Sequence, residues 1–387
     1  MTGVEPVRVV IAGGGTGGHL FPGIAVAREI VRREAEAVVT FAGTAQGLEA
    51  RVLPREGFAL DVIRSGGVKG KSAATRIRNL GLLPASAWDA WRVLSRRSPR
   101  AVIGLGGYSS GPVVLLAALR GIPTLLMEQN AVPGMTNRLL ARVVSAAAVT
   151  FEETAGHFRG KGFVTGNPVR PEFLEAGRSE IAERAAHPRG ATGVLVFGGS
   201  QGAHAINVAM VEAAARLAAA PIRLDLVHQT GERDVEMVRE GYRRAGQAAR
   251  VEPFLFAMAR EVSAADFVVC RAGATTVAEI AAAARPAILI PLPTATDDHQ
   301  RKNAEVLVRA GAAEVIDQRD LTGERLAGTI LALAQDPDRR RRMALAARAL
   351  ARPDAAERIV DRVLVLARQK AKGGTRLRPA GFGGPGT

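Results

Sequence analysis

A histidine that follows a run of glycines is the first residue of this chain that could do chemistry. Residues 13–19 read GGGTGGH and come directly after the apolar segment Val9–Ala12. A glycine turn of this kind exposes backbone N–H groups at the start of a helix, where they bind anions. An imidazole titrates near neutral pH, so His19 beside a bound anion is a candidate general base. The alternative is a histidine that only caps or packs against the turn.

Glu128 is the rival base, because it ends another apolar segment and faces the same region. Two more glycine-rich turns, 104–112 (GLGGYSSGP) and 198–202 (GGSQG), also follow apolar segments. Two anion-binding turns in the first half predict a diphosphate ligand, and the third predicts that phosphates are held from both walls of a cleft. An ion-paired or solvated carboxylate is the alternative for Glu128.

The first turn also matches a dinucleotide-binding fingerprint. Gly13, Gly15 and Gly18 satisfy G-x-G-x-x-G, which alone is weak evidence. That function also needs an acidic residue after the second strand to hold the ribose, but the second strand ends in residues 41–44, FAGT. An oxidoreductase or a nucleotide-binding regulator is therefore the weaker hypothesis.

Apolar segments that alternate with helical patterns predict the elements that position these turns. The expected strands are Val7–Ala12, Val38–Ala42, Ala101–Leu105, Thr124–Met127, Val194–Phe197, Leu224–His228, Phe267–Cys270 and Ala287–Pro291. This alternation predicts two α/β units, each with a parallel sheet covered by helices. Residues 9–19 and 194–204 echo each other, VVIAGGGTGGH against VLVFGGSQGAH, which indicates an internal duplication.

The chain divides into four expected segments. A first domain covers residues 1–168 and a second covers 169–350, because two prolines break the chain at GNPVRP. A helix at 351–370 is expected to pack back on the first domain, and 371–387 is expected to be a basic disordered tail. A cleft should open between the two domains.

The formal net charge of +15 is concentrated in two places. Residues 64–100 hold nine basic side chains against one acidic side chain, and residues 368–387 hold five against none. Such a distribution argues against a nucleic-acid enzyme and favours one local anionic surface, such as lipid headgroups. No apolar run approaches the roughly 20 residues that span a bilayer, and no secretion signal begins the chain, so a cytoplasmic protein is expected.

Metal and disulfide chemistry have little support in the sequence. Cys270 is the single cysteine, which excludes an internal disulfide and a cysteine-based metal cage. Residues 336–338 read DPD and superficially resemble a metal-binding pattern, but an aspartate before a proline there predicts a helix N-cap. We therefore expect no metal site and no cofactor.

Residues 73–94 combine apolar and basic side chains and contain both tryptophans of the chain. The candidate membrane-facing residues are Ile77, Leu80, Leu83, Trp88 and Trp91. An apolar face ringed by cations fits an element that rests among anionic headgroups, where each basic residue adds about 1 kcal/mol. The alternative is that the tryptophans fill the domain core and the arginines face water.

Seven motifs resemble, in order, those of the bacterial peptidoglycan glycosyltransferase family known as MurG. They are GGGTGGHLFPG at 13–23, GGYSSGP at 106–112, EQN at 128–130, GNPVR at 166–170, GGSQGA at 198–203, CRAGATTVAE at 270–279 and DDHQRKNA at 297–304. The resemblance covers residues 7–362 and implies the GT-B fold, in which two Rossmann-like domains with parallel sheets face an inter-domain cleft. Within the motifs, Met127 and Ser109 depart from common family residues, which leaves the fine acceptor contacts open.

The resemblance also implies a reaction. N-acetylglucosamine moves from UDP-GlcNAc to the C4 hydroxyl of MurNAc in lipid I (undecaprenyl-pyrophosphoryl-MurNAc-pentapeptide), giving lipid II by an inverting, metal-independent, β-1,4 transfer. The enzyme would act as a peripheral protein on the cytoplasmic face of the inner membrane, in peptidoglycan synthesis that underlies cell shape and division. Its expected partners are both substrates, the anionic inner leaflet and a cell-wall synthesis complex, with no nucleic acid. Another lipid-acceptor glycosyltransferase of the same fold is the alternative.

Residue roles carried over from the family complete the prediction. The residues implied around UDP-GlcNAc are Thr16, Gly17, Gly18, Asn130, Arg170, Ser200, Leu255, Ala274, Thr275, Thr276, Val277, Ala278, Glu279 and Gln300. Among them, Glu279 can accept both ribose hydroxyls, and Arg170 can stabilise the charge on departing UDP. The residues expected to cradle the acceptor diphosphate are Gly14, Gly15, Gly106, Gly107, Tyr108 and Ser109.

Overall fold

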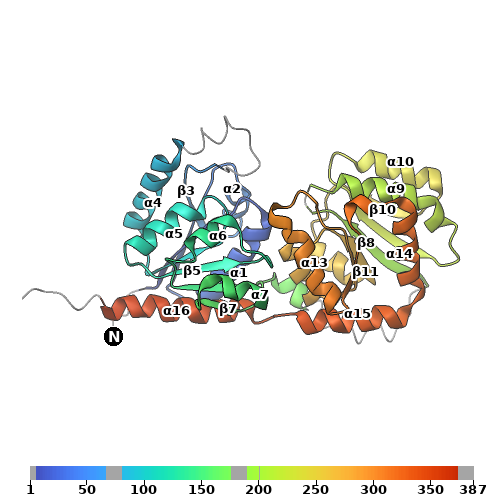
Figure 1. Cartoon of the computed structure of the whole chain (residues 1–387). Coiled ribbons are helices and arrows are strands. Elements are labelled where there is room, and N and C mark those ends of the chain that lie inside the picture. The colour runs from blue at the N-terminus through green and yellow to red at the C-terminus, as the bar shows by residue number, and fades with distance from the viewer. Residues whose placement is uncertain (1–5, 67–80, 176–189, 200, 374–387) are drawn as a thin grey trace, which may run out of the picture.

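Two parallel β-sheets, each packed between helices, form two lobes of the molecule (Figure 1). The structure is a computed structural model that describes residues 6–66, 81–175, 190–199 and 201–373, with side chains described up to residue 369. The predicted fold, two α/β units with parallel sheets, is confirmed. Ile77, Leu80 and Ser200 of the predicted sites lie outside the described residues.

The first sheet has seven strands in the order β3-β2-β1-β4-β5-β6-β7. The strands are β1 (Arg8–Ala12), β2 (Val38–Gly43), β3 (Ala59–Val62), β4 (Ala101–Gly104), β5 (Thr124–Glu128), β6 (Ala146–Val149) and β7 (Gly162–Val164). The helices that follow them are α1 (Gly17–Arg33), α2 (Glu49–Val52), α4 (Leu83–Arg97), α5 (Ser110–Leu119), α6 (Met135–Leu140), α7 (Glu152–Ala155) and the 3-10 helix η1 (Gly156–Phe158).

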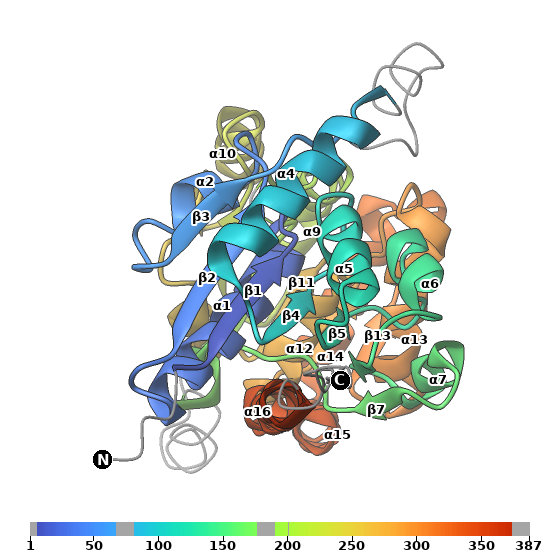
Figure 2. The ribbon, with the colours of Figure 1, turned by 90° about the vertical axis from the view of Figure 1, so that its left-hand side faces the viewer.

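The alternation of side chains along β1 explains how this sheet is covered. Val9 and Ile11 pack with α1 on one face, whereas Val10 and Ala12 pack with α4 and α5 on the other face. Both sets are almost fully buried, as expected for the central strand of a parallel sheet. Figure 2 shows α4 and α5 in front of the sheet and α16 (Ala355–Gly373) beside its lower edge.

The second sheet has six strands in the order β10-β9-β8-β11-β12-β13. The strands are β8 (Thr192–Phe197), β9 (Leu224–Gln229), β10 (Ala249–Glu252), β11 (Phe267–Cys270), β12 (Ala287–Leu289) and β13 (Ala313–Val315). The other elements are α9 (His204–Ala218), α10 (Val235–Ala245), α11 (Met258–Ala264), α12 (Ala274–Ala282), η2 (Thr296–Asp298), α13 (His299–Arg309), η3 (Gln318–Asp320), α14 (Gly323–Gln335) and α15 (Pro337–Leu350). The two sheets thus share the order of their first six strands, which agrees with the repeat seen in the sequence.

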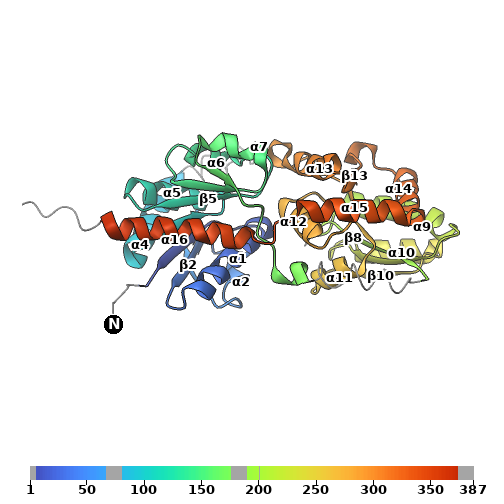
Figure 3. The ribbon, with the colours of Figure 1, turned by 90° about the horizontal axis from the view of Figure 1, so that it is seen from below.

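The last helix returns to the first lobe, as Figure 3 shows from below. α16 buries Ile359, Val360 and Val363 in the core that contains β1 and α1. Burial of each such side chain contributes roughly 1.5–3 kcal/mol. The domain limits themselves stay a prediction.

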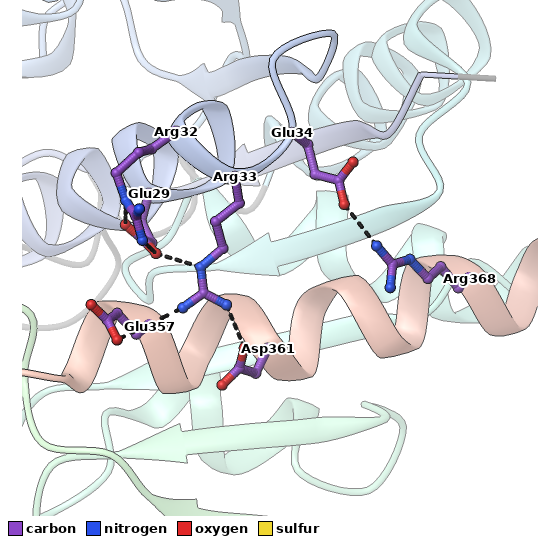
Figure 4. A network of polar contacts seen from close by, with 7 residues as sticks. All are labelled: Glu29, Arg32, Arg33, Glu34, Glu357, Asp361 and Arg368. Atoms are coloured by element: carbon purple, nitrogen blue, oxygen red, sulfur yellow. Dashed lines mark hydrogen bonds and ion pairs between the residues drawn. The ribbon is translucent and has the colours of Figure 1, made fainter. Parts of the chain in front are cut away.

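Ion pairs line the same contact (Figure 4). Arg33 of α1 pairs with Asp361 and with Glu29, and Arg368 pairs with Glu34 at 2.7 Å. Exposed pairs such as Arg368 with Glu34 add about 0–1 kcal/mol each, so the apolar face contributes most to holding α16 in place.

Candidate active site

The first two glycine turns meet where the strand order of the first sheet reverses, between β1 and β4. Such a switch point is where ligands bind in open α/β sheets. Gly13 has φ +122°, and a Cβ there would lie 2.6 Å from the carbonyl oxygen of Gly106, which itself has φ +90°. Only glycine permits this backbone and this approach. The two turns predicted separately from the sequence therefore form one surface.

A cleft of about 190 Å³ opens beside this surface and is lined by both domains. Its lining residues from the first domain are His19, Gly106, Gly107, Tyr108, Glu128, Asn130, Val132, Gly134, Met135, Thr136 and Asn137. Asp297 of η2 and His299, the first residue of α13, line it from the second domain. Both candidate bases and half of the predicted acceptor turn are thus brought together.

His19 lies half-buried in the first turn of α1, at the wall of this cleft. Burial, with a smaller contribution from the charge of His299, lowers the pKa of His19 to about 4. The imidazole is therefore neutral at pH 7 and has a lone pair to offer. Its Nδ1 lies 3.3 Å from Thr16 Oγ1, and a Cβ at Gly106 would lie 3.4 Å from its Nε2.

Glu128 ends β5 and is almost fully buried. Its Oε1 accepts hydrogen bonds from the backbone N–H and the side chain of Asn130, at 3.1 and 3.3 Å. Its Oε2 accepts from Gly134 N at 3.0 Å and from Asn137 Nδ2 at 2.8 Å. Burial raises the pKa of Glu128, and these donors partly oppose that rise. A carboxylate has about four lone-pair positions. Those of Glu128 all accept hydrogen bonds, from Asn130, Gly134 and Asn137, so the carboxylate is fully used in holding this segment.

A proline in α1 prepares a contact between the domains. Pro22 has no N–H, so the carbonyl oxygen of Gly18, four residues earlier, lacks its usual helical donor. Thr275 Oγ1, in the first turn of α12, donates to that oxygen at 3.0 Å. Gly18 and Thr275 were both predicted at the donor site, and the structure places them in contact.

Asn303 makes a second contact between the domains, which the sequence did not single out. It is fully buried, accepts from Ala131 N at 2.9 Å, and donates to Asn130 Oδ1 at 3.3 Å and to Ala272 O at 3.2 Å. Asn130 was predicted at the donor sugar, and here it joins Glu128 to Asn303.

Arg170 and Glu279 were both predicted at the donor, and the structure pairs them with each other. The guanidinium donates to Glu279 Oε1 from Nη2 at 2.8 Å and from Nε at 3.2 Å, and it lies over the rings of Phe21 and Phe173. Glu279 is nearly buried, and burial raises its pKa against the opposing charge of Arg170. Each side chain is thus held by the other.

Gln229 joins two loops that were predicted at the donor site, and the sequence analysis did not single it out. It ends β9, is almost fully buried, donates to Gly199 O at 2.8 Å and accepts from Leu255 N at 3.0 Å. Gly199 belongs to the third glycine turn, and Leu255 was predicted at the donor. Its position at the end of a buried strand, where the other candidate residues also lie, could have indicated Gln229.

Most of the remaining predicted donor residues lie on the second domain. Ala274 begins α12, so residues 274–279 occupy its first turns and Glu279 faces inward. Gln300 is half-buried in the first turn of α13, and its Oε1 accepts from Leu292 N at 3.0 Å. Thr16 and Gly17 lie at the start of α1, on the first-domain side.

The predicted acceptor turn is only partly open. Tyr108 is 37% exposed and lines the cleft, whereas Ser109 is buried. Gly15 donates its N–H to the buried carboxylate of Glu49 at 2.7 Å. The first glycine turn is therefore occupied on one side by the protein itself.

The tryptophans lie on the surface, so the alternative that they fill the core is wrong. Trp88 and Trp91 on α4 are 58% and 47% exposed and stack with ring centroids 5.1 Å apart. Leu83 on the same helix is also exposed. The sequence did not predict that α5 and α6 extend this apolar surface, where Leu83, Leu115, Met135 and Leu139 line one hollow. The added exposed residues are Leu115 and Leu119 on α5, Met135 and Leu139 on α6, and Val143 just after α6.

The described residues were compared with the side-chain clusters that bind metal ions. Among those residues, no group of three or more His, Cys, Asp or Glu side chains is placed to hold a metal ion. The predicted N-cap at Asp336 is confirmed, because its Oδ1 accepts from Arg339 N at 2.7 Å. Within the same described residues, no helix is both long and apolar enough to cross a bilayer.

Comparison with known proteins agrees with this geometry. The glycosyltransferase family 28 N-terminal domain matches residues 9–149, and the family 28 C-terminal domain matches residues 193–359. The UDP-N-acetylglucosamine–N-acetylmuramyl-(pentapeptide) pyrophosphoryl-undecaprenol N-acetylglucosamine transferase of Anaeromyxobacter sp. (strain K) is 49% identical over 94% of both chains. The protein of the same name from Geobacter sulfurreducens is 45% identical over 94% of this chain and 100% of its own length.

Solved structures give the same result. The crystal structure of MurG from Acinetobacter baumannii superposes with a TM-score of 0.75 at 33% identity, covering 93% of this chain and all of that one. The glycosyltransferase of kitacinnamycin, at 19% identity and a TM-score of 0.70 over 94% of this chain and all of that one, shares the fold alone. The chain belongs to the MurG family of glycosyltransferase family 28.

Proposed function

We propose that this enzyme transfers N-acetylglucosamine from UDP-GlcNAc to the C4 hydroxyl of MurNAc in lipid I, with inversion at the anomeric carbon. The observation that carries the proposal is the cleft in which His19 and the glycine turns of the first domain face α13 of the second domain. The names of relatives up to 49% identical specify both substrates. The acceptor then enters from the first domain and the donor from the second.

His19 is the proposed general base. In the tautomer that carries its proton on Nδ1, the ring donates to Thr16 Oγ1 and leaves the Nε2 lone pair for the acceptor hydroxyl. Burial, with a smaller contribution from His299, lowers the pKa of this ring to about 4. Two bound diphosphates bring negative charge and raise this pKa toward neutrality, so the base is best matched to its task when both substrates are bound.

Glu128 is better suited to positioning than to proton transfer. Its two oxygens already accept four hydrogen bonds, from Asn130, Gly134 and Asn137. The Oδ1 of Asn130 in turn accepts a hydrogen bond from Asn303 on the second domain. Glu128 thereby holds the cleft wall that His19 and Tyr108 share.

The departing UDP is stabilised from the second domain. Donor binding would draw Glu279 to the ribose hydroxyls and turn Arg170 toward the diphosphate, where charged hydrogen bonds contribute about 1.5–3 kcal/mol each. The N-terminus of α12, at Ala274, adds the positive end of a helix. These groups supply the charge stabilisation, so the proposed step uses no metal ion.

A competition assay tests the reaction. Purified enzyme with radiolabelled UDP-GlcNAc and an equal mixture of lipid I and diacylglycerol should label lipid I alone. Label found only in diacylglycerol would make the enzyme another lipid-acceptor transferase of this fold.

We also propose that the surface of α4, α5 and α6 rests on an anionic membrane, with the enzyme peripheral on the cytoplasmic face. The exposed Trp88, Trp91 and Leu139 lie on these helices together with the exposed Arg92, and the exposed Arg142 follows just after α6. Apolar side chains enter the headgroup region while the arginines neutralise the lipid phosphates.

Vesicle sedimentation tests this surface. Burial of one large apolar side chain is worth roughly 1.5–3 kcal/mol, so replacing Trp88 and Trp91 with serine should weaken binding to phosphatidylglycerol vesicles by about tenfold or more. Phe256→Ser, at a 92% exposed position on the second domain, is the matched control and should bind as wild type does. Equal loss in both variants would refute the assignment of this surface.

A further inference from the structure

Glu49 is a buried carboxylate directly beneath the first glycine turn. It is 0% exposed and begins α2. Its Oε2 accepts from Gly15 N at 2.7 Å, and its Oε1 accepts from Thr44 N at 2.8 Å and from Thr44 Oγ1 at 2.9 Å. One side chain thus joins the loop after β1 to the loop after β2.

Three glycines surround this carboxylate. A Cβ at Gly14 or Gly43 would lie 2.8 Å from an atom of the Glu49 side chain, and a Cβ at Gly47 would lie 2.1 Å from one. A larger residue at any of these positions would displace the carboxylate. Gly14, which the sequence assigned to phosphate binding, is therefore one of the glycines that leave room for the Glu49 side chain.

Gly15, which donates to Glu49, lies two residues before the start of α1. α1 has no acidic residue in its first turn, although a helix N-terminus carries a partial positive charge. In phosphate-binding Rossmann turns, the N–H groups at this place bind the phosphate. Here Gly15 donates to Glu49 instead, and a phosphate at the same place would meet a like charge.

The turn that Glu49 holds leads directly to the candidate base. Thr16 follows Gly15, and its Oγ1 lies 3.3 Å from His19 Nδ1. The path from Glu49 to His19 therefore runs through one backbone hydrogen bond and one short segment of chain. A shift of the turn would move Thr16 and with it the orientation of the imidazole.

We propose that Glu49 is a positioning residue that acts as a built-in anion. It occupies one side of the first glycine turn, keeps phosphate off the N–H of Gly15, and fixes the segment that aims His19 into the cleft. The acceptor diphosphate is thereby directed to the second turn, at 106–109. This inference rests on the proposed function.

Glu49→Gln tests the proposal with almost no change in volume. The amide must present its NH₂ group either to Gly15 N or to Thr44 N, so one loop loses its acceptor and moves. A misplacement of about 1 Å can cost about 100-fold in rate, so kcat should fall by about that factor while the UDP dissociation constant stays within about twofold of wild type. Glu56→Gln, a nearby partly exposed carboxylate paired with Arg28, is the control and should keep wild-type kcat.

Chemical rescue separates the anion from general damage to the fold. In Glu49→Ala, formate should restore part of kcat in a saturable way, and it should not accelerate wild type, because only the variant has an empty anion position. Wild-type kcat in Glu49→Gln would overturn the proposal. So would Glu49→Ala that formate does not restore and that loses UDP affinity as steeply as kcat. A wild-type enzyme that transfers nothing to lipid I would instead refute the proposed function.

Discussion

Replacing Glu128 with glutamine distinguishes an anchoring carboxylate from a catalytic base. A base and its amide have the same shape, so the loss of a base should abolish turnover and leave the fold intact. An anchor behaves differently here, because each oxygen of Glu128 accepts two hydrogen bonds. Whichever oxygen is replaced by the NH₂ group, the two donors that pointed at that oxygen then face another donor.

The magnitude follows from these contacts. Each buried donor left without an acceptor costs about 1–3 kcal/mol, so two cost about 4 kcal/mol. Removing a buried charge offsets part of this cost, since burial already raises the pKa of Glu128. A net loss of about 2 kcal/mol corresponds to about 4–8 °C in Tm for a domain of this size.

Differential scanning calorimetry of Glu128→Gln measures this loss, with Glu153→Gln as the matched control. Glu153 pairs with Arg309 at 2.8 Å, and both side chains are mostly exposed, so its amide should keep the wild-type Tm. An unchanged Tm in Glu128→Gln together with abolished turnover would refute the anchoring role and make Glu128 the base.

Three further predictions concern the donor and the pH dependence. Glu279→Ala should weaken UDP-GlcNAc binding by about 10- to 100-fold in calorimetric titration, because it removes a charged hydrogen-bond acceptor worth about 1.5–3 kcal/mol; unaltered affinity would contradict its ribose role. Gln229→Leu should raise the donor KM more than it lowers kcat, since it uncouples Gly199 from Leu255, and a pure kcat effect would place Gln229 elsewhere in the mechanism. The pKa of His19 lies below its ordinary value of 6.5, so the base stays unprotonated as pH falls through that value. The acid limb of kcat/KM that belongs to His19 should therefore begin well below pH 6.5, and an acid limb near pH 7 that disappears in His19→Ala would show that the free-enzyme pKa is not lowered.

Much of the fold was predictable because long apolar strands alternate with helices. The strand Phe267–Cys270 has the predicted bounds, and the central strand β1 differs from its prediction by one residue. The missed strands are short or alanine-rich: β6 reads AAAV, which has no strand signature until it pairs with β5. Whether such segments form strands depends on their tertiary pairing, and local propensity does not decide it.

The site residues at the ends of strands could be predicted from the sequence, whereas the residues that hold them in place were harder to predict. His19, Glu128 and the turn at 106–109 follow strands directly, and parallel strands bring such ends to one edge. Glu49 and Asn303 each join segments that are far apart in the chain, and no local sequence pattern indicates such contacts. The pairing of Arg170 with Glu279 was likewise invisible, because each was assigned to the substrate.

The central claim, that His19 takes the proton of the acceptor hydroxyl, is tested most directly by single-turnover transfer to lipid I with saturating UDP-GlcNAc. General-base catalysis contributes about 10²- to 10⁴-fold, so His19→Ala should slow the chemical step by at least about 100-fold, with UDP affinity within about twofold of wild type. His299→Ala, which changes the other histidine that lines the cleft, should slow this step far less. A His19→Ala enzyme that completes the single turnover at the wild-type rate would contradict the account.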